Sequence, residues 1–73
     1  MDTDGGDMMK LDVLKVKLIL ARKELNQTDL AKKCGMRRQA LNEIFERGSC
    51  TLKTLGKIAK ALEVDVTEII KED

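Results

Sequence analysis

Apolar residues recur at helical spacing along most of the chain, with charged residues between them, and this pattern predicts a domain of short helices. The first predicted helix covers about residues 11–24. Its apolar residues lie on two faces, a wider distribution than the single stripe of an ordinary amphipathic helix. One face carries Val13, Val16, Ile19 and Leu20, and the other carries Leu11, Leu14, Leu18 and Ala21.

Capping residues divide the next part of the chain into two more helices. Asn26 is expected to start the second helix, because its side-chain oxygen can accept a hydrogen bond from a free amide of the first turn. Gly35 is expected to end that helix. A third helix is predicted from residue 37 or 38 to residue 46, and Gly48 with Ser49 closes it into a loop.

Two further helices are expected after this loop. Thr51 can cap a fourth helix whose apolar residues recur at helical spacing, namely Leu52, Leu55, Ile58, Ala59 and Leu62. Asp65-Val66-Thr67-Glu68 has the form of a capping box and predicts a last short helix that carries Ile69 and Ile70. The predicted fold class is therefore all-α, a compact bundle of five helices without strands.

The start of the chain differs from the rest. Residues 1–7 contain three aspartates and two adjacent glycines and show no periodicity. Residues 1–9 are therefore expected to form a disordered acidic leader that is dispensable for folding. The folded domain is predicted to span residues 10–73.

The spacing of apolar residues around Gly35 predicts a helix-turn-helix. Two short helices that cross steeply need an inward apolar pair, a residue that tolerates positive φ, and a second apolar pair. Leu30 with Ala31, then Gly35, then Leu41 with Ile44 supply these in order. Ala31 is small enough to sit where the two helices pass closest.

This stretch and its surroundings resemble the phage repressor and Cro type of DNA-binding domain, over about residues 13–70. Asn26-Gln27 is similar to the start of the family's second helix, and Gly35 to its turn glycine. The segment Arg37-Arg38-Gln39-Ala40-Leu41-Asn42 resembles the front of its recognition helix. Residues 51–55, 59–62 and 64–66 resemble the fourth helix and the lead into a fifth, which implies the lambda-repressor-like fold.

Composition limits the classes of function. A single domain of 73 residues with 42 % hydrophobic and 37 % charged residues suits a small helical protein without a deep substrate cleft. The chain has no histidine, tyrosine or glycine-rich phosphate loop, so no enzyme, metal or cofactor is expected. Cys34 and Cys50 are expected to be free thiols, with Cys34 in the core, which is consistent with a reducing cytoplasm. No segment has the length or composition of a signal peptide or a membrane span.

The charges are segregated along the chain. Residues 32–60 carry eight basic and two acidic residues, whereas residues 1–9 have a net charge of −3 and residues 63–73 of −4. The basic segment can displace counterions from DNA, and the acidic ends are expected to face away from it. For Lys57 and Lys60, a simpler role in solvating the helix surface is favoured.

The resemblance implies that the third helix enters the major groove while the second lies across the phosphate backbone. Because Leu41 and Ile44 face inward, other residues of the third helix should face the bases. The candidate base contacts are Arg37, Arg38, Gln39, Asn42 and Glu43, of which Glu43 can either accept from cytosine or repel phosphate. The candidate phosphate contacts are Asn26, Gln27, Arg47 and Lys53.

Two positions depart from the family pattern. Arg37 stands at the cap of the recognition helix, where relatives commonly have a residue such as serine that can accept from a backbone amide. Leu20 and Phe45 stand where many relatives have a buried arginine–glutamate pair. The paired change predicts that the two apolar side chains meet in the core.

The leading functional prediction is sequence-specific binding of double-stranded DNA, most simply as a prokaryotic or phage transcriptional repressor. An inverted-repeat operator and a homodimer, at least on DNA, suit this fold. Leu14 and Leu18 then have two interpretations, since they can pack on Ile69 and Ile70 or form a patch that joins two subunits. The alternative function is an antitoxin with a toxin partner, or an adaptor that keeps the fold. No membrane partner is expected.

Overall fold

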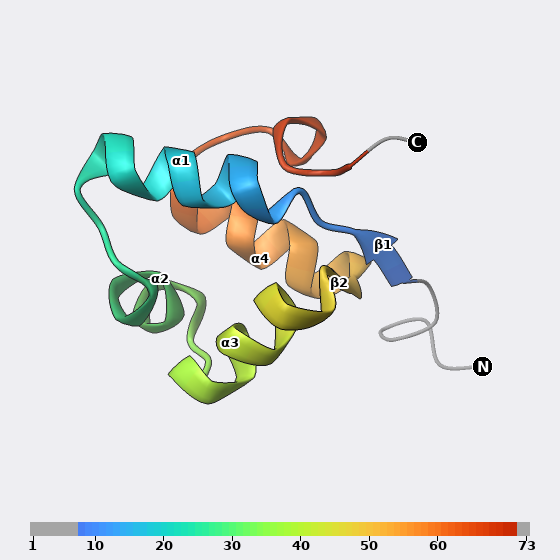
Figure 1. Cartoon of the computed structure of the whole chain (residues 1–73), viewed down its shortest axis with the longest axis horizontal. Coiled ribbons are helices and arrows are strands. Elements are labelled where there is room, and N and C mark those ends of the chain that lie inside the picture. Colours follow the sequence, from blue (N-terminus) through green and yellow to red (C-terminus); the bar gives the residue numbers. More distant parts are fainter. Residues whose placement is uncertain (1–7, 72–73) are drawn as a thin grey trace.

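The computed structural model describes residues 8–71, and residues 1–7 of the predicted leader lie outside this range. These residues contain four α-helices and two short strands (Figure 1). The elements in order are β1 (Met8–Lys10), α1 (Val13–Lys23), α2 (Gln27–Cys34), α3 (Arg38–Arg47), β2 (Ser49–Thr51), α4 (Leu52–Leu62) and the 3-10 turn η1 (Val66–Glu68). The prediction of five helices without strands is therefore wrong in two respects, although the four longer helices are confirmed.

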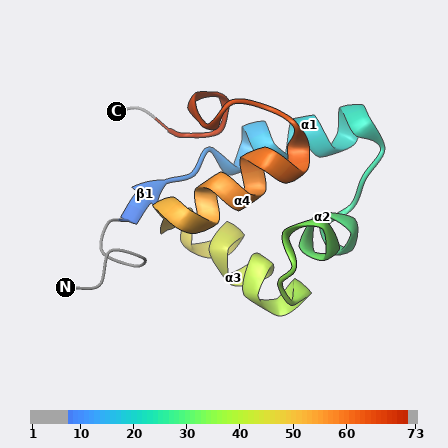
Figure 2. The ribbon, with the colours of Figure 1, turned by 180° about the vertical axis from the view of Figure 1, so that it is seen from behind.

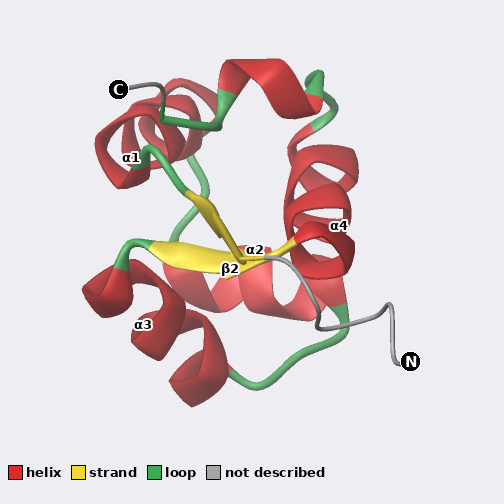
Figure 3. Cartoon of the chain, turned by 90° about the vertical axis from the view of Figure 1, so that its right-hand side faces the viewer, coloured by secondary structure: helices red, strands yellow, loops and turns green. Residues whose placement is uncertain are grey.

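The first correction is a two-stranded antiparallel sheet, visible beside the start of α4 in Figure 3. Met8 pairs with Thr51, Met9 with Cys50 and Lys10 with Ser49. Met8 and Met9 therefore belong to the fold and not to a leader. Three-residue strands are too short to show an alternating pattern, and this pairing joins segments that are far apart in the sequence.

The second correction concerns the end of the chain. The Asp65 side chain accepts from the Thr67 amide at 3.1 Å, and Val66–Glu68 makes a single 3-10 turn instead of a helix. The following backbone pairs with the N-terminal segment, since the Asp12 amide donates to the Ile69 carbonyl at 2.8 Å and the Lys71 amide donates to the Lys10 carbonyl at 3.0 Å. This pairing requires extended backbone, which a longer helix could not supply.

Leu11 lies where three segments meet. Its amide donates to the Gly48 carbonyl at 2.8 Å, and it forms an antiparallel bridge with Ile70. The side chain is 2 % exposed. Leu11 thus precedes α1, which begins when Asp12 Oδ1 accepts from the Lys15 amide at 3.0 Å.

A single hydrophobic core lies among the four helices, and Figure 2 shows α4 covering it from behind. Its buried helical residues are Val16, Ile19 and Leu20 from α1, Leu30, Ala31 and Cys34 from α2, Leu41 and Phe45 from α3, and Leu55, Ile58, Ala59 and Leu62 from α4. Leu20 and Phe45 are both buried in this cluster, and that their side chains meet stays a prediction.

Leu14 and Leu18 stay outside the core. They are 67 % and 61 % exposed, while Ile69 is fully buried. The interpretation that they pack on Ile69 and Ile70 is therefore wrong. None of the helices described in residues 8–71 is long and apolar enough to cross a bilayer.

Candidate nucleic-acid interface

The start of α2 is fixed by two reciprocal hydrogen bonds. Asn26 Oδ1 accepts from the Asp29 amide at 2.8 Å, and Asp29 Oδ2 accepts from the Asn26 amide at 3.1 Å. The predicted Asn26 cap is confirmed, and Asp29 completes it as a capping box that the sequence analysis did not identify. Two free amides of the first turn are thereby satisfied.

Gly35 forms the turn between α2 and α3. Its φ of 71° lies in the left-handed region, which residues with a Cβ adopt only at a cost. In this conformation the Gly35 amide can donate to the carbonyls of Ala31 and Lys32 and close the end of α2. The predicted turn glycine is confirmed, and it sets the direction in which α3 leaves.

The inner face of α3 holds the helix against the core. Leu41 is fully buried, Phe45 is 8 % exposed and Ile44 is partly buried. The first turns of the opposite side are solvent-exposed, including all the candidate base contacts: Arg37, Arg38, Gln39, Asn42 and Glu43. The helix thus presents two long donors and two amides without burying them.

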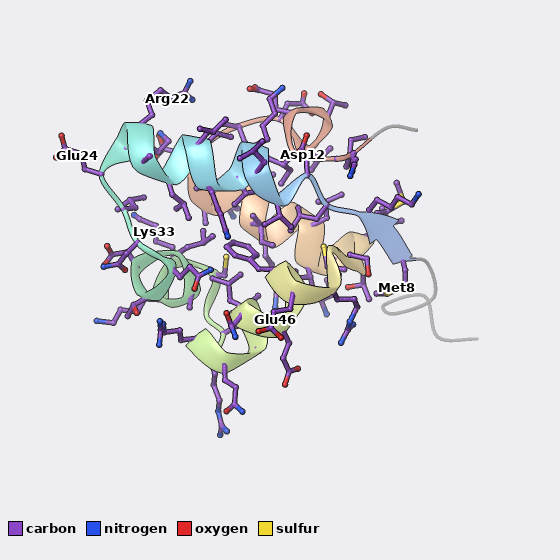
Figure 4. The ribbon with its side chains drawn as sticks, viewed as in Figure 1. Met8, Asp12, Arg22, Glu24, Lys33 and Glu46 are labelled. Atoms are coloured by element: carbon purple, nitrogen blue, oxygen red, sulfur yellow. The ribbon has the colours of Figure 1, made fainter. Side chains whose placement is uncertain are left out.

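Asn42 does not stand alone on this surface. Its Nδ2 donates to Glu46 Oε2 at 3.3 Å, one turn further along α3, where Figure 4 labels Glu46. Glu46 is not among the predicted site residues, although its spacing of four residues from Asn42 is a signal that could have indicated this contact. The contact engages the Asn42 Nδ2 on the exposed outer face of α3.

The first turn of α3 has no such support. Arg37 occupies the cap position with φ −75° and ψ 147°, and within residues 8–71 no side-chain hydrogen bond caps this helix. The free amides of the first turn are left for water or for another acceptor. A phosphate oxygen is one such acceptor, because the helix N-terminus carries a partial positive charge.

The candidate phosphate contacts are spread over three elements. Asn26 is exposed at the start of α2, but its Oδ1 is engaged in the cap, so only its Nδ2 could donate to a phosphate. Gln27 is half-buried beside it, and Lys53 is exposed in the first turn of α4. Arg47 ends α3 and lines a hollow together with Leu14 and Lys71, so it lies away from the first turn of α3.

Charge is distributed unevenly over the molecule. The exposed basic residues Lys32, Lys33, Arg37 and Arg38 occupy the end of α2 and the start of α3. Asp65 caps η1 and Glu68 is its last residue, and η1 lies on the opposite side of the molecule from α3 in Figures 1 and 2. Glu63, from the same acidic segment, instead lines a hollow with Lys33 of α2, so the expectation that the whole segment faces away from DNA stays a prediction.

A helix-turn-helix family model matches residues 16–69, which is most of the chain. The chain belongs to the Cro/C1-type helix-turn-helix family. Among solved structures, it is similar to the restriction-modification controller protein C.AhdI from Aeromonas hydrophila, with a TM-score of 0.68 and 28 % sequence identity over 77 % of this chain and 86 % of that one. A search of curated proteins returned no match. These findings make the protein a DNA-binding regulator of transcription.

The two thiols of this helix-turn-helix domain are free and buried. Burial raises the pKa of the Cys34 thiol, and the nearby Lys57 opposes this in part. Cys34 Sγ also donates to the Lys57 carbonyl at 3.7 Å. Burial likewise raises the pKa of Cys50. Both side chains are therefore protonated at neutral pH and act as small core residues.

Proposed function

We propose that this helix-turn-helix domain binds a specific duplex sequence with the first turns of α3 in the major groove. The observation that carries the proposal is the division of α3 into two sides. The buried side chains of Leu41 and Phe45 hold the helix against the core. On its other side, Arg38, Gln39 and Asn42 are exposed. A helix anchored in this way can present its side chains to base edges without rearranging.

The three exposed side chains have complementary base preferences. Arg38 can donate two hydrogen bonds to guanine O6 and N7. Gln39 can pair twice with adenine, and Asn42 can do so once its Nδ2 leaves Glu46. Glu43 can accept from cytosine at the same surface. Arg37 lies close to these residues and adds charge where α3 has free amides.

Contacts to the DNA backbone would then come from α2 and α4. The start of α2, with Gln27 and the Asn26 Nδ2, would meet one phosphate strand, and Lys53 would meet the backbone from α4. Arg47 would add a contact from the end of α3. Such contacts set the register of the helix on the duplex but carry no sequence information.

We further propose a homodimer on an inverted-repeat operator and regulation by occupying that operator, most simply as repression. The similarity to a restriction-modification controller protein suggests the genes of a restriction-modification system as one set of targets. A role as antitoxin or adaptor remains the second candidate from the fold. A steep loss of affinity for random duplex as salt rises supports DNA binding, whereas an adaptor has little affinity to lose.

The proposal is tested by selecting bound sequences from a random duplex library and measuring Arg38→Ala on the consensus. The substitution should weaken specific binding by about 1–3 kcal/mol and relax the preference at one base pair of each half-site. Lys17→Ala, an exposed basic residue on α1, is the matched control and should retain the preference. Unchanged discrimination in Arg38→Ala, or a consensus without two-fold symmetry, would refute base reading by Arg38 or the dimer, respectively.

A further inference from the structure

The outer face of α1 carries an exposed apolar ridge that we define as Leu14, Leu18 and Ala21. These residues follow one another at helical spacing on the side opposite the buried Val16 and Ile19. Leu14 and Leu18 are the most exposed large hydrophobic residues in the described part of the chain, at 67 % and 61 %. Two adjacent leucines with so much surface in water mark a contact site more often than isolated ones do.

Basic residues border this ridge along its length. Lys17 lies on one side of it and Lys15 and Arg22 on the other, all three exposed, and Figure 4 shows Arg22 pointing away from the molecule. The sequence of α1, VLKVKLILARK, contains no acidic residue. The surface is therefore apolar along its centre and positive at both margins.

The ridge continues at its Leu14 end into a hollow of about 520 Å³. Basic side chains from three segments line this hollow, namely Lys10, Arg47 and Lys71. Asp12 is also part of the lining, but its Oδ1 already accepts from the Lys15 amide at the start of α1. A carboxylate entering the hollow would meet a predominantly positive environment.

We infer that this face of α1 docks an amphipathic helix of another protein, with apolar residues one turn apart and carboxylates on both sides of them. Such a helix would lay its apolar residues against Leu14 and Leu18 and place its carboxylates near the basic margins. One acidic side chain could reach the hollow. Charge complementarity favours this partner, because its carboxylates would lie against the basic residues that border the ridge.

A second copy of the chain fits this face poorly. In a two-fold interface the same patch meets itself, so the basic margins of two α1 helices would lie against each other.

The separation of α1 from the start of α3 would let the partner and DNA bind together. In Figure 1 α1 lies apart from the first turns of α3, so a partner on the ridge would leave the proposed base-reading side of α3 open. Arg47 is the predicted DNA contact that also lines the hollow. The domain would thus connect a DNA site to a second protein through two different surfaces.

The experiment titrates the isotope-labelled full chain with a synthetic helical peptide that has leucines one turn apart, bordered by glutamates. Amide resonances of α1 around Leu14 and Leu18 should shift, while a peptide with lysines in place of the glutamates should leave them unchanged. The double variant Leu14→Ser, Leu18→Ser should bind at least about tenfold more weakly. Because both leucines are exposed, this variant should keep the spectrum of a folded chain, and Leu52→Ser, half exposed on α4, is the matched control.

Four results would overturn the inference. They are shifts that centre on α3, equal binding of the lysine peptide, the same α1 shifts with anionic lipid vesicles, and no shift at millimolar peptide. A fifth contradicting result would come from sedimentation of the chain alone. If the chain self-associates and the double variant does not, the ridge joins two copies of this chain. None of these measurements uses DNA, so a result that contradicts the docking site would not bear on the proposed DNA binding.

Discussion

The two helices of the helix-turn-helix are held in different ways. α2 has a complete capping box at its start, where Asn26 and Asp29 satisfy each other's amides. α3 begins at Arg37 without a side-chain cap in the described residues. Both helices end in a glycine with positive φ, Gly35 and Gly48, so the difference lies at their starts.

The difference matches the proposed roles of the two helices, since α2 is proposed to contact the DNA backbone and α3 to contact the bases. α2 is ordered by local hydrogen bonds, which depend little on the rest of the fold. α3 depends on its inner face, where Leu41 and Phe45 are buried, because nothing local fixes its first turn. The end of α3 that is proposed to meet DNA is therefore left with free amides and a positive side chain, and its order rests on the core.

The largest effect is expected from removing the buried Phe45 ring that holds α3 against the core. Phe45→Ala should lower the free energy of unfolding by about 3–5 kcal/mol, because it deletes a buried ring from a tightly packed core. Urea unfolding followed by circular dichroism measures the change. Phe45→Leu should cost less, and an unchanged melting midpoint in Phe45→Ala would refute the placement of the ring in the core.

The cap of α2 should contribute less. Asn26→Ala should lower the free energy of unfolding by about 1 kcal/mol, because the Asp29 amide loses its acceptor and half of the capping box disappears. Chemical denaturation is again the measurement. Asn26→Asp keeps an acceptor at the cap and is the control, which should stay close to the parent. Equal stability of the alanine variant would mean that α2 is ordered by packing alone.

The uncapped start of α3 predicts a change of the opposite sign. Arg37→Ser should raise the free energy of unfolding by about 0.5–1 kcal/mol by supplying the missing acceptor, and should weaken DNA binding through the loss of one positive charge. Denaturation and a salt-dependent binding titration on the same variant measure both effects. Arg37→Lys separates them, since it keeps the charge but cannot cap. A serine variant that gains stability and keeps full affinity would show that Arg37 is not near DNA.

The smallest effect concerns the thiol on the inner face of α2. The pKa of Cys34 is raised by burial, so the folded state holds this proton more tightly than the unfolded state. Stability should therefore be full below the unfolded thiol pKa of about 8.5 and fall as the pH rises through and above it. Urea midpoints between neutral and alkaline pH, measured under reducing conditions, should decline less steeply in Cys34→Ala. Parallel declines in both proteins would assign the pH dependence to other groups.

Local signals accounted for much of the fold and for the exposure of the proposed site. The caps at Asn26 and Thr51, the turn at Gly35 and the inward residues Leu41 and Ile44 follow from side-chain chemistry within one or two turns. Because each depends on neighbours close in sequence, the pattern of residues was enough to predict them. The DNA-contacting roles of individual side chains stay predictions, as these depend on a partner molecule.

The amino-acid sequence alone determined the helix-turn-helix and the residues on the two sides of α3, since helical periodicity and capping are short-range. Only the tertiary structure decided the ends of the chain. The β1–β2 pairing, the bridge between Leu11 and Ile70 and the single turn in place of a fifth helix all depend on backbone hydrogen bonds between distant segments. It also decided that Leu14 and Leu18 stay in solvent, because the C-terminal segment pairs with the N-terminal backbone instead of covering α1.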